Sequence, residues 1–311
     1  MAVSKENNHQ NVDLIKVASV VSVSVASLLV AVKVWVWLLT GSLSVLASLV
    51  DSGLDVAASL VNMLAIRYSF KSADRDHPFG HGKAEFLAGL GQALFIAFSA
   101  IFVIVQAMQR FASPRSLEST GAGIGMMIFA VMATCGLVFF QSNVVKRTGS
   151  MAIKADSLHY AADLFTNLGT IAALLLARMG WPGLDPLIAI FIALVVLYNA
   201  GQIGYRSSQL LMDCNLSPEM EEEISRIAMD HKEVIGIHDI RTRRSGQTRI
   251  IQLHLEMLGS MSLNEAHRVA KEVEMEIRAV VPEADIIIHQ DPAVSNEGAG
   301  HQRGPVIERD M

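Results

Sequence analysis

Cysteine is scarce in this sequence, with two in 311 residues. Cys135 lies inside an apolar run and Cys214 lies just after the last one, so neither a disulfide framework nor a thiolate metal site is indicated. The chain has no block rich in lysine and arginine, and its formal net charge is −5, which argues against nucleic acid as a partner. The N-terminus is polar and too long for the basic start of a signal peptide, and no small-residue cleavage site stands out after the first apolar run. We therefore expect that run to remain as a membrane span.

Two catalytic motifs are also missing. An intramembrane zinc protease would need a metal-bound water and a neighbouring base, but the usual helical motif HExxH is absent. The string from Gly80 to Lys83 superficially resembles a phosphate-binding loop, but its spacing is wrong and Ala84 replaces the required Ser or Thr. The sequence therefore predicts neither an enzyme nor an ATP-driven pump.

Long uncharged runs fill the first two thirds of the chain. Each is long enough to cross a bilayer core, which takes about 20 helical residues. The six runs cover 14–39, 42–68, 84–109, 121–145, 151–177 and 185–205. We therefore predict an α-helical membrane protein, with a six-helix transmembrane domain over residues 1–212.

Lysine and arginine are unevenly distributed between the two sides of these spans. Seven lie around the loops that join spans 2–3 and 4–5: Arg67, Lys71, Arg75, Lys83, Lys146, Arg147 and Lys154. Three lie on the other side: Arg110, Arg115 and Arg178. The excess of positive charge predicts that these two loops and both termini are cytoplasmic.

The last third of the chain has the pattern of a small α/β domain, predicted over 213–293. Apolar periodicity indicates helices over 217–231 and 262–281, and strands over 236–244, 249–257 and 284–289, with a hairpin turn at 245–247. The order αββαβ predicts a small sheet with its helices on one face. The Gly-, Asn- and charge-rich tail over 294–311 is expected to be disordered.

Four ionisable side chains lie well inside two of the predicted spans. Span 2 holds Asp51 and Asp55, and span 5 holds His159 and Asp163. Each pair is spaced i,i+4, so its members share one helical face. Carboxylates in the bilayer interior are costly unless they are paired or hydrated. Three carboxylates and an imidazole suit a tetrahedral Zn²⁺ site, so we predict that the four residues surround a cation.

These charges have two other interpretations. The first is a salt network or a set of helix-end charges. Lys33 is an example of a helix-end charge, because one lysine near the end of span 1 can extend to the membrane surface. No basic residue in the span interiors is expected to neutralise three acids. The second is a metal sensor that does not transport, but a sensor has no need of ligands at mid-membrane.

The spacing of the four membrane ligands resembles the signature of the cation diffusion facilitators, and most closely the bacterial YiiP/FieF-type zinc exporters. The stretches FGHGKAE, ADSLHY, HDIRTR, QLHLEM and IIIHQDP extend the resemblance from span 1 to Pro292. It implies a multi-pass homodimer of the inner (plasma) membrane that exports Zn²⁺, and often Cd²⁺, in exchange for protons. Residues Asp51, Asp55, His159 and Asp163 match the transport site of the family.

Other histidines gather outside the spans. In the 2–3 loop, Asp74, His77 and His81 match a second metal site of the family; a polar loop at the membrane edge is the alternative. In the C-terminal domain, strand periodicity places His254 opposite the core-facing positions and puts His289 and Asp291 on one face. The full set that matches a paired-ion site of the family is His238, His254, His267, His289 and Asp291. A solvated surface is the alternative there.

The resemblance also pairs Lys83 with Asp213, as a charge pair at the dimer seam between the membrane and C-terminal domains. From the sequence alone these are two ordinary charges at the membrane edge. For the mechanism, an unperturbed histidine pKa of about 6.5 allows His159 to release metal when it is protonated. The sequence does not fix the ion, because such a ligand set also suits Cd²⁺, Fe²⁺, Co²⁺ or Mn²⁺.

Overall fold

A computed structural model of the chain describes residues 2–41, 43–112, 121–178, 184–282, 284–293 and 307–308. Residues Gln10–Ser208 form one compact unit, and Gln209–Met311 form the main part of a second, with Met1–His9. Most of the predicted disordered tail, 294–306 and 309–311, lies outside the described residues.

Six long helices make up the first unit, as predicted. They are α1 (Ala2–Thr40), α2 (Leu43–Ser69), α3 (Lys83–Ala112), α4 (Gly121–Thr148), α5 (Met151–Arg178) and α6 (Leu184–Leu211). Among the described residues, five of these helices are apolar and long enough to cross a membrane. Helix α5 falls outside this set, and its first half carries Lys154, Asp156, His159 and Asp163. The first helix starts before the predicted run because no Gly or Pro occurs ahead of Gly41 to end it.

Helix α5 is held in place from several sides. It packs against α2, α3 and α4. Its first backbone N–H, at Met151, donates to Glu85 Oε1 of α3 at 3.1 Å, which satisfies a donor that a helix start leaves open. Near its far end, Gly169 allows α6 to approach closely, because a Cβ there would lie 2.7 Å from Ile192 Cδ1. These contacts fix the helix that carries His159.

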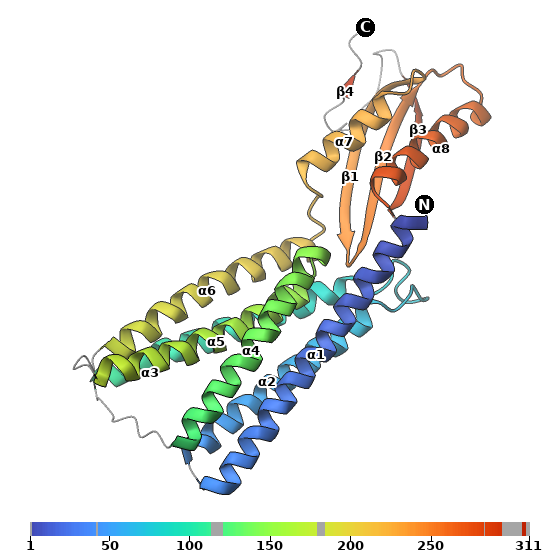
Figure 1. Ribbon diagram of the computed structural model, residues 1–311. Coiled ribbons are helices and arrows are strands. Elements are labelled where there is room, and N and C mark those ends of the chain that lie inside the picture. The colour runs from blue at the N-terminus through green and yellow to red at the C-terminus, as the bar shows by residue number, and fades with distance from the viewer. Residues whose placement is uncertain are drawn as a thin grey trace. The chain divides into compact units, whose positions relative to one another are not determined.

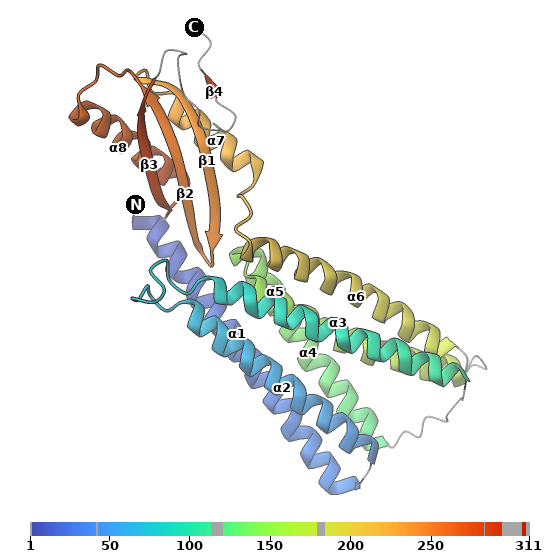
Figure 2. The ribbon, with the colours of Figure 1, turned by 180° about the vertical axis from the view of Figure 1, so that it is seen from behind.

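The helices of the first unit are not parallel throughout. Figures 1 and 2 show α1 beside α2 and α3 beside α6 in both views. In both views α1, α2 and α4 also diverge from α3, α5 and α6 toward the ends of α1 and α2 that adjoin residue 41. At the other ends of these helices, an apolar cluster joins α1, α2, α4 and α5 through Ile15, Ile66, Val144 and Ile153.

The second unit is a four-stranded sheet with two helices. Its elements are α7 (Pro218–Met229), β1 (Val234–Ser245), β2 (Thr248–Met257), α8 (Leu263–Val280), β3 (Asp285–Pro292) and β4 (Ile307–Glu308). The strand order is β3-β2-β1-β4, with β1 antiparallel to β2 and β4, and β2 parallel to β3. The hairpin turn at Gly246 has a φ of 61°, which suits glycine.

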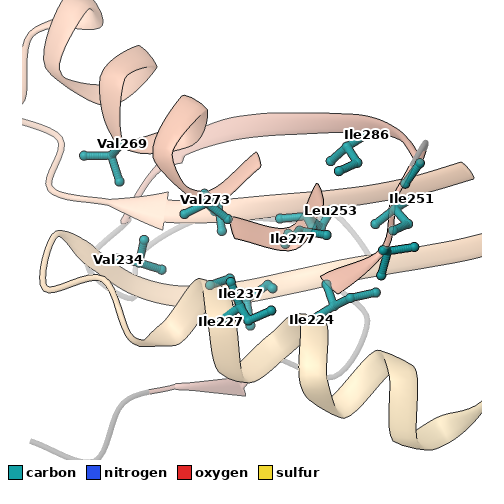
Figure 3. Packing of buried hydrophobic residues seen from close by; sticks show 14 of the residues in the cluster. Ile224, Ile227, Val234, Ile237, Ile251, Leu253, Val269, Val273, Ile277 and Ile286 are labelled. Atoms are coloured by element: carbon teal, nitrogen blue, oxygen red, sulfur yellow. The ribbon is translucent and has the colours of Figure 1, made fainter. Parts of the chain in front are cut away.

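The core of this unit lies between the sheet and its helices (Figure 3). Ile224 and Ile227 of α7 and Val273 and Ile277 of α8 belong to one buried cluster with the inward-facing strand residues. The predicted inward alternation over 251–257 is confirmed, because Ile251, Leu253, Leu255 and Met257 are all buried. Both helices thus share one core, and α8 begins with a capping box formed by Ser262 and Glu265.

The short strand β4 departs from the expected disorder of the tail. Ile307 pairs with Ile237 and Glu308 with Gly236, at the edge of β1. An edge strand presents unpaired N–H and C=O groups that an extended segment of almost any sequence can use, so composition alone does not reveal such pairing.

Candidate metal sites

Three of the four predicted membrane ligands meet in the helix bundle. His159 Nε2 lies 3.0 Å from Asp55 Oδ1 and 3.8 Å from Asp163 Oδ2. Each of the three offers a ligand atom within 4.8 Å of the others, so one ion fits among them. Asp55 comes from α2, while His159 and Asp163 lie one turn apart on α5. The contact between these two helices therefore creates the site.

Asp51 does not join this group. It lies one turn before Asp55, in the first half of α2, and is exposed. Exposure falls along the site, with side-chain values of 37% for Asp163, 17% for Asp55 and 7% for His159. Asp163 is therefore the most exposed of the three ligands and His159 the most buried.

Beyond His159 the bundle is closed by a polar layer that sequence reasoning missed. Asp156, on α5 one turn before His159, is fully buried and accepts a hydrogen bond of 2.7 Å from Gln141 Nε2 of α4. The same Gln141 nitrogen donates to Ser22 Oγ of α1 at 2.7 Å. Ser59 of α2 contacts Asp156 Oδ1 at 3.4 Å and Tyr160 Oη at 2.6 Å. Four helices thus meet at one buried carboxylate.

The structure places Lys33 differently from the expectation that it extends to the membrane surface. It does not extend to the surface; its Nζ donates to the backbone oxygen of Ser48 at 3.1 Å and to Ser52 Oγ at 2.5 Å, both on α2. A backbone carbonyl and a hydroxyl inside the bundle satisfy two of the ammonium's three donors, which explains why the side chain stays there. The expectation that Lys33 extends to the membrane surface is therefore wrong, although one lysine does not neutralise three acids.

The predicted loop site is also brought together. Asp74 Oδ1 lies 3.4 Å from His77 Nδ1, and Asp74 Oδ2 lies 3.4 Å from His81 Nε2. His81 is buried, and its Nε2 makes no hydrogen bond within the described residues, as expected of an atom kept for a metal ligand. A hydrogen bond from Lys71, followed by one from the His77 backbone N–H, lowers the pKa of Asp74 well below its usual range. The carboxylate is therefore ionised and able to bind a cation.

In the C-terminal domain, three histidines form a row across the sheet. His238 of β1 is paired with His254 of β2, which is paired with His289 of β3. Asp291 lies one strand period further on and contacts all three, at 3.3 Å from His238 Nε2, 2.8 Å from His254 Nδ1 and 2.9 Å from His289 Nδ1. His238, His254 and Asp291 can hold one ion.

The chemistry of this row fits a divalent metal. His238 is buried, and its Nδ1, 3.3 Å from Glu256 Oε1, makes no hydrogen bond within the described part of the domain. Partial burial opposes ionisation of Asp291, but hydrogen bonds from His254 and His289 outweigh it and lower the pKa of that carboxyl. Glu256 was not among the predicted ligands, although its strand parity matches that of His254.

His267 and the Lys83–Asp213 pair stay predictions. His267 is exposed on α8, and its ligand atoms do not group with the row within the described residues. Asp213 Oδ2 accepts a hydrogen bond of 3.1 Å from Arg243 Nη1 of its own unit. Lys83 belongs to the other unit.

Comparison with known proteins covers nearly the whole chain. The cation efflux transmembrane domain matches residues 19–212, and the cytoplasmic domain of cation efflux proteins matches 216–293. The "Cation-efflux pump FieF" of Escherichia fergusonii is 45% identical over 287 residues, which is 92% of this chain and 96% of that protein. The protein of the same name from Shigella flexneri serotype 5b gives the same identity and coverage.

A solved structure, the "Metal-bound C-terminal domain of CzcD transporter from Thermotoga maritima", is 26% identical and covers 25% of this chain and 93% of that one, with a TM-score of 0.24. The family matches and the curated relatives are decisive. They confirm the predicted fold class and show a multi-pass membrane protein that is not an enzyme. The chain belongs to the cation diffusion facilitator family, as a divalent metal cation efflux transporter of the YiiP/FieF type.

Proposed function

We propose that this protein exports Zn²⁺ from the cytoplasm in exchange for protons, by alternating access across the inner membrane. The observation that supports the proposal most strongly is the close approach of Asp55, His159 and Asp163 inside the membrane unit. Two carboxylates and an imidazole within reach of one ion are oxygen and nitrogen ligands that suit Zn²⁺. Asp51 is the fourth proposed ligand, one turn away on the exposed side.

Several further assignments belong to the same proposal. The transport domain covers 1–212, the metal-binding domain covers 213–293, and 294–311 is a tail. The chain is a homodimer, with both termini in the cytoplasm. Cd²⁺ and Fe²⁺ are the competing substrates. Competitive uptake of Zn²⁺, Cd²⁺ and Fe²⁺ into proteoliposomes under an imposed proton gradient tests the choice of ion, and a consistent preference for Fe²⁺ would reject zinc as the main substrate.

The burial pattern supports alternating access. On one side of the group the Asp51 carboxylate is exposed, while on the other Asp156 is fully buried within a hydrogen-bonded layer. A site that is open on one side and closed on the other can exchange ions with one compartment at a time. A pore open at both ends would dissipate the metal and proton gradients.

Proton coupling gives the next prediction. Because protons and metal compete for His159 and the carboxylates, collapsing a proton gradient should stop uphill Zn²⁺ accumulation in proteoliposomes, and Zn²⁺ flux should move protons the other way. A pH-sensitive dye inside the vesicles measures the second effect. Asp163→Ala vesicles are the control for passive leak. Accumulation of Zn²⁺ against its gradient with no dependence on the proton gradient would contradict the exchange.

A separate prediction concerns the proposed ion in the C-terminal domain. Residues 213–293 contain nearly all of one apolar core, so this fragment should fold in water. Zn²⁺ at about 100 times its dissociation constant should stabilise it by about 2.7 kcal/mol. For a domain of this size that is a rise in melting temperature of about 10–20 °C. Calorimetry measures the rise, and sedimentation should show tighter dimerisation.

The double variant His254→Ala with Asp291→Ala should lose both effects. The matched control replaces His231 and Asp230 by alanine, which removes the same two residue types outside the row. His231 contacts Glu276 at 3.3 Å instead. If saturating Zn²⁺ leaves the melting and association of the unmodified fragment unchanged, the row is a solvated surface and not a metal site.

A further inference from the structure

Lys33 is a membrane-span lysine fixed beside the transport site. It belongs to the apolar part of α1, and its ammonium bonds Ser48 O and Ser52 Oγ of α2. These two acceptors lie four residues apart on one turn of α2, and Asp51 lies on the same turn. The acceptors therefore hold a positive charge at the level of the site.

The proposed ligands of α2 lie on and beside the turn that holds Lys33. Asp51 lies between Ser48 and Ser52 in the sequence, and Asp55 lies one turn further along the same helix. The proposed site with a neutral His159 carries three negative charges, and Zn²⁺ brings two positive ones. With Lys33 the loaded site carries no net charge. Without Lys33 it would carry one net charge, which is costly to enclose in a membrane protein.

We propose that Lys33 is the built-in counter-ion of the transport site, where it limits how tightly the site retains its metal. The inference rests on the proposed transport function. A fixed ammonium attracts the ligand carboxylates and repels the divalent ion, so it partly offsets the attraction of three acids. The ion is then held firmly enough to load and weakly enough to leave. Lys33 is thus a positioning charge and not a ligand.

The proposal predicts a particular change in kinetics when the charge is removed. In Lys33→Gln, the amide still donates hydrogen bonds to α2 but is neutral. We expect the Zn²⁺ concentration that gives half-maximal flux to fall about tenfold, because removing one unit charge near a divalent ion strengthens binding. The turnover number should fall as well, because release of the more tightly held ion becomes limiting. Lys33→Arg keeps the charge and should retain near-normal values of both.

The experiment measures Zn²⁺ flux by the full-length protein in proteoliposomes, as a function of Zn²⁺ concentration. It compares the wild type with Lys33→Gln, Lys33→Met and Lys33→Arg. The matched control is Lys16→Met on the same helix, since Lys16 Nζ lies over the Phe70 ring, 5.3 Å from its centroid, and away from the acids. Its half-saturating concentration should not change.

The outcomes separate the counter-ion from a purely structural role. A lysine that only ties α1 to α2 would, when replaced, lower melting temperature and turnover with half-saturation unchanged or raised. That result in Lys33→Gln, or an arginine variant that behaves like the glutamine one, overturns the proposal. Lys33→Met provides the same test if Lys33→Gln does not fold. If Asp163→Ala still transports Zn²⁺, the proposed transport site is wrong. If Asp163→Ala is inactive while Lys33→Gln has the half-saturation and turnover of the wild type, the transport site stands and only the counter-ion role of Lys33 is rejected.

Discussion

Replacing Asp163 by alanine is expected to abolish Zn²⁺ transport while leaving the protein folded. The Asp163 carboxylate lies 3.8 Å from His159 Nε2, and its side chain is 37% exposed, so little packing is lost with it. Removing even an outer-shell partner of a metal ligand costs about 10- to 100-fold, and loss of a ligand itself should cost at least that much. Flux in proteoliposomes measures the effect.

The control for Asp163→Ala is Asp13→Ala, which removes an exposed carboxylate from α1 outside the group. It should transport normally. Gel filtration and melting of both detergent-solubilised variants establish that folding is intact. Retention of most of the wild-type flux by Asp163→Ala would show that the ion does not bind where Asp55, His159 and Asp163 meet. Single replacements of the C-terminal histidines should reduce flux much less.

The membrane site shows what spacing alone can predict. The i,i+4 pattern correctly put Asp51 with Asp55, and His159 with Asp163, on single helical faces. It does not determine the level at which α2 crosses α5, and that level decides that Asp55 meets His159 while Asp51 stays apart. Lys33 illustrates the same limit, because hydropathy cannot tell whether a lysine extends to the surface or bonds a neighbouring helix.

The C-terminal row was easier to predict in one respect. Strand parity placed His254 away from the core and put His289 and Asp291 on one face, and the structure agrees. The parallel pairing of β2 with β3, which puts His289 directly beside His254, depends on which strands pair and in what register. Glu256 had the right parity as well, but acidic residues on exposed strand faces are common, so its place beside His238 was not foreseen.

Asp156 was missed because a single acid in a span has no spacing partner of its own. The available signal was its position in the stretch ADSLHY, one turn before His159. Its partners Ser22, Ser59 and Gln141 come from three different helices, and no periodicity within one helix identifies such a set. Only the packing of α1, α2, α4 and α5 brings them together.

Asp156→Ala should therefore destabilise the membrane unit strongly. The change removes the buried carboxylate to which Gln141 and Ser59 donate, and it leaves a cavity lined by their unpaired polar groups. Loss of a hydrogen bond costs about 0.5–1.5 kcal/mol, and a buried partner left unpaired costs about 1–3 kcal/mol, so we expect a loss of about 3 kcal/mol or more. Melting of the purified protein in detergent measures it, with Asp13→Ala as the control.

The variant Asp156→Leu tests whether the hydrogen bonds of the polar layer around Asp156 stabilise the fold, or whether close packing alone is sufficient. Replacing a buried polar group by an apolar side chain of similar volume is often nearly neutral, because the cost of desolvating the polar group disappears. Here leucine would leave Gln141 Nε2 bonded to Ser22 alone and would separate Ser59 from α5 except through Tyr160. We expect Asp156→Leu to melt lower than the wild type and to transport more slowly, because His159 lies one turn away on the same helix. A leucine variant as stable and active as the wild type would mean that close packing, and not the hydrogen-bonded carboxylate, closes the site on this side.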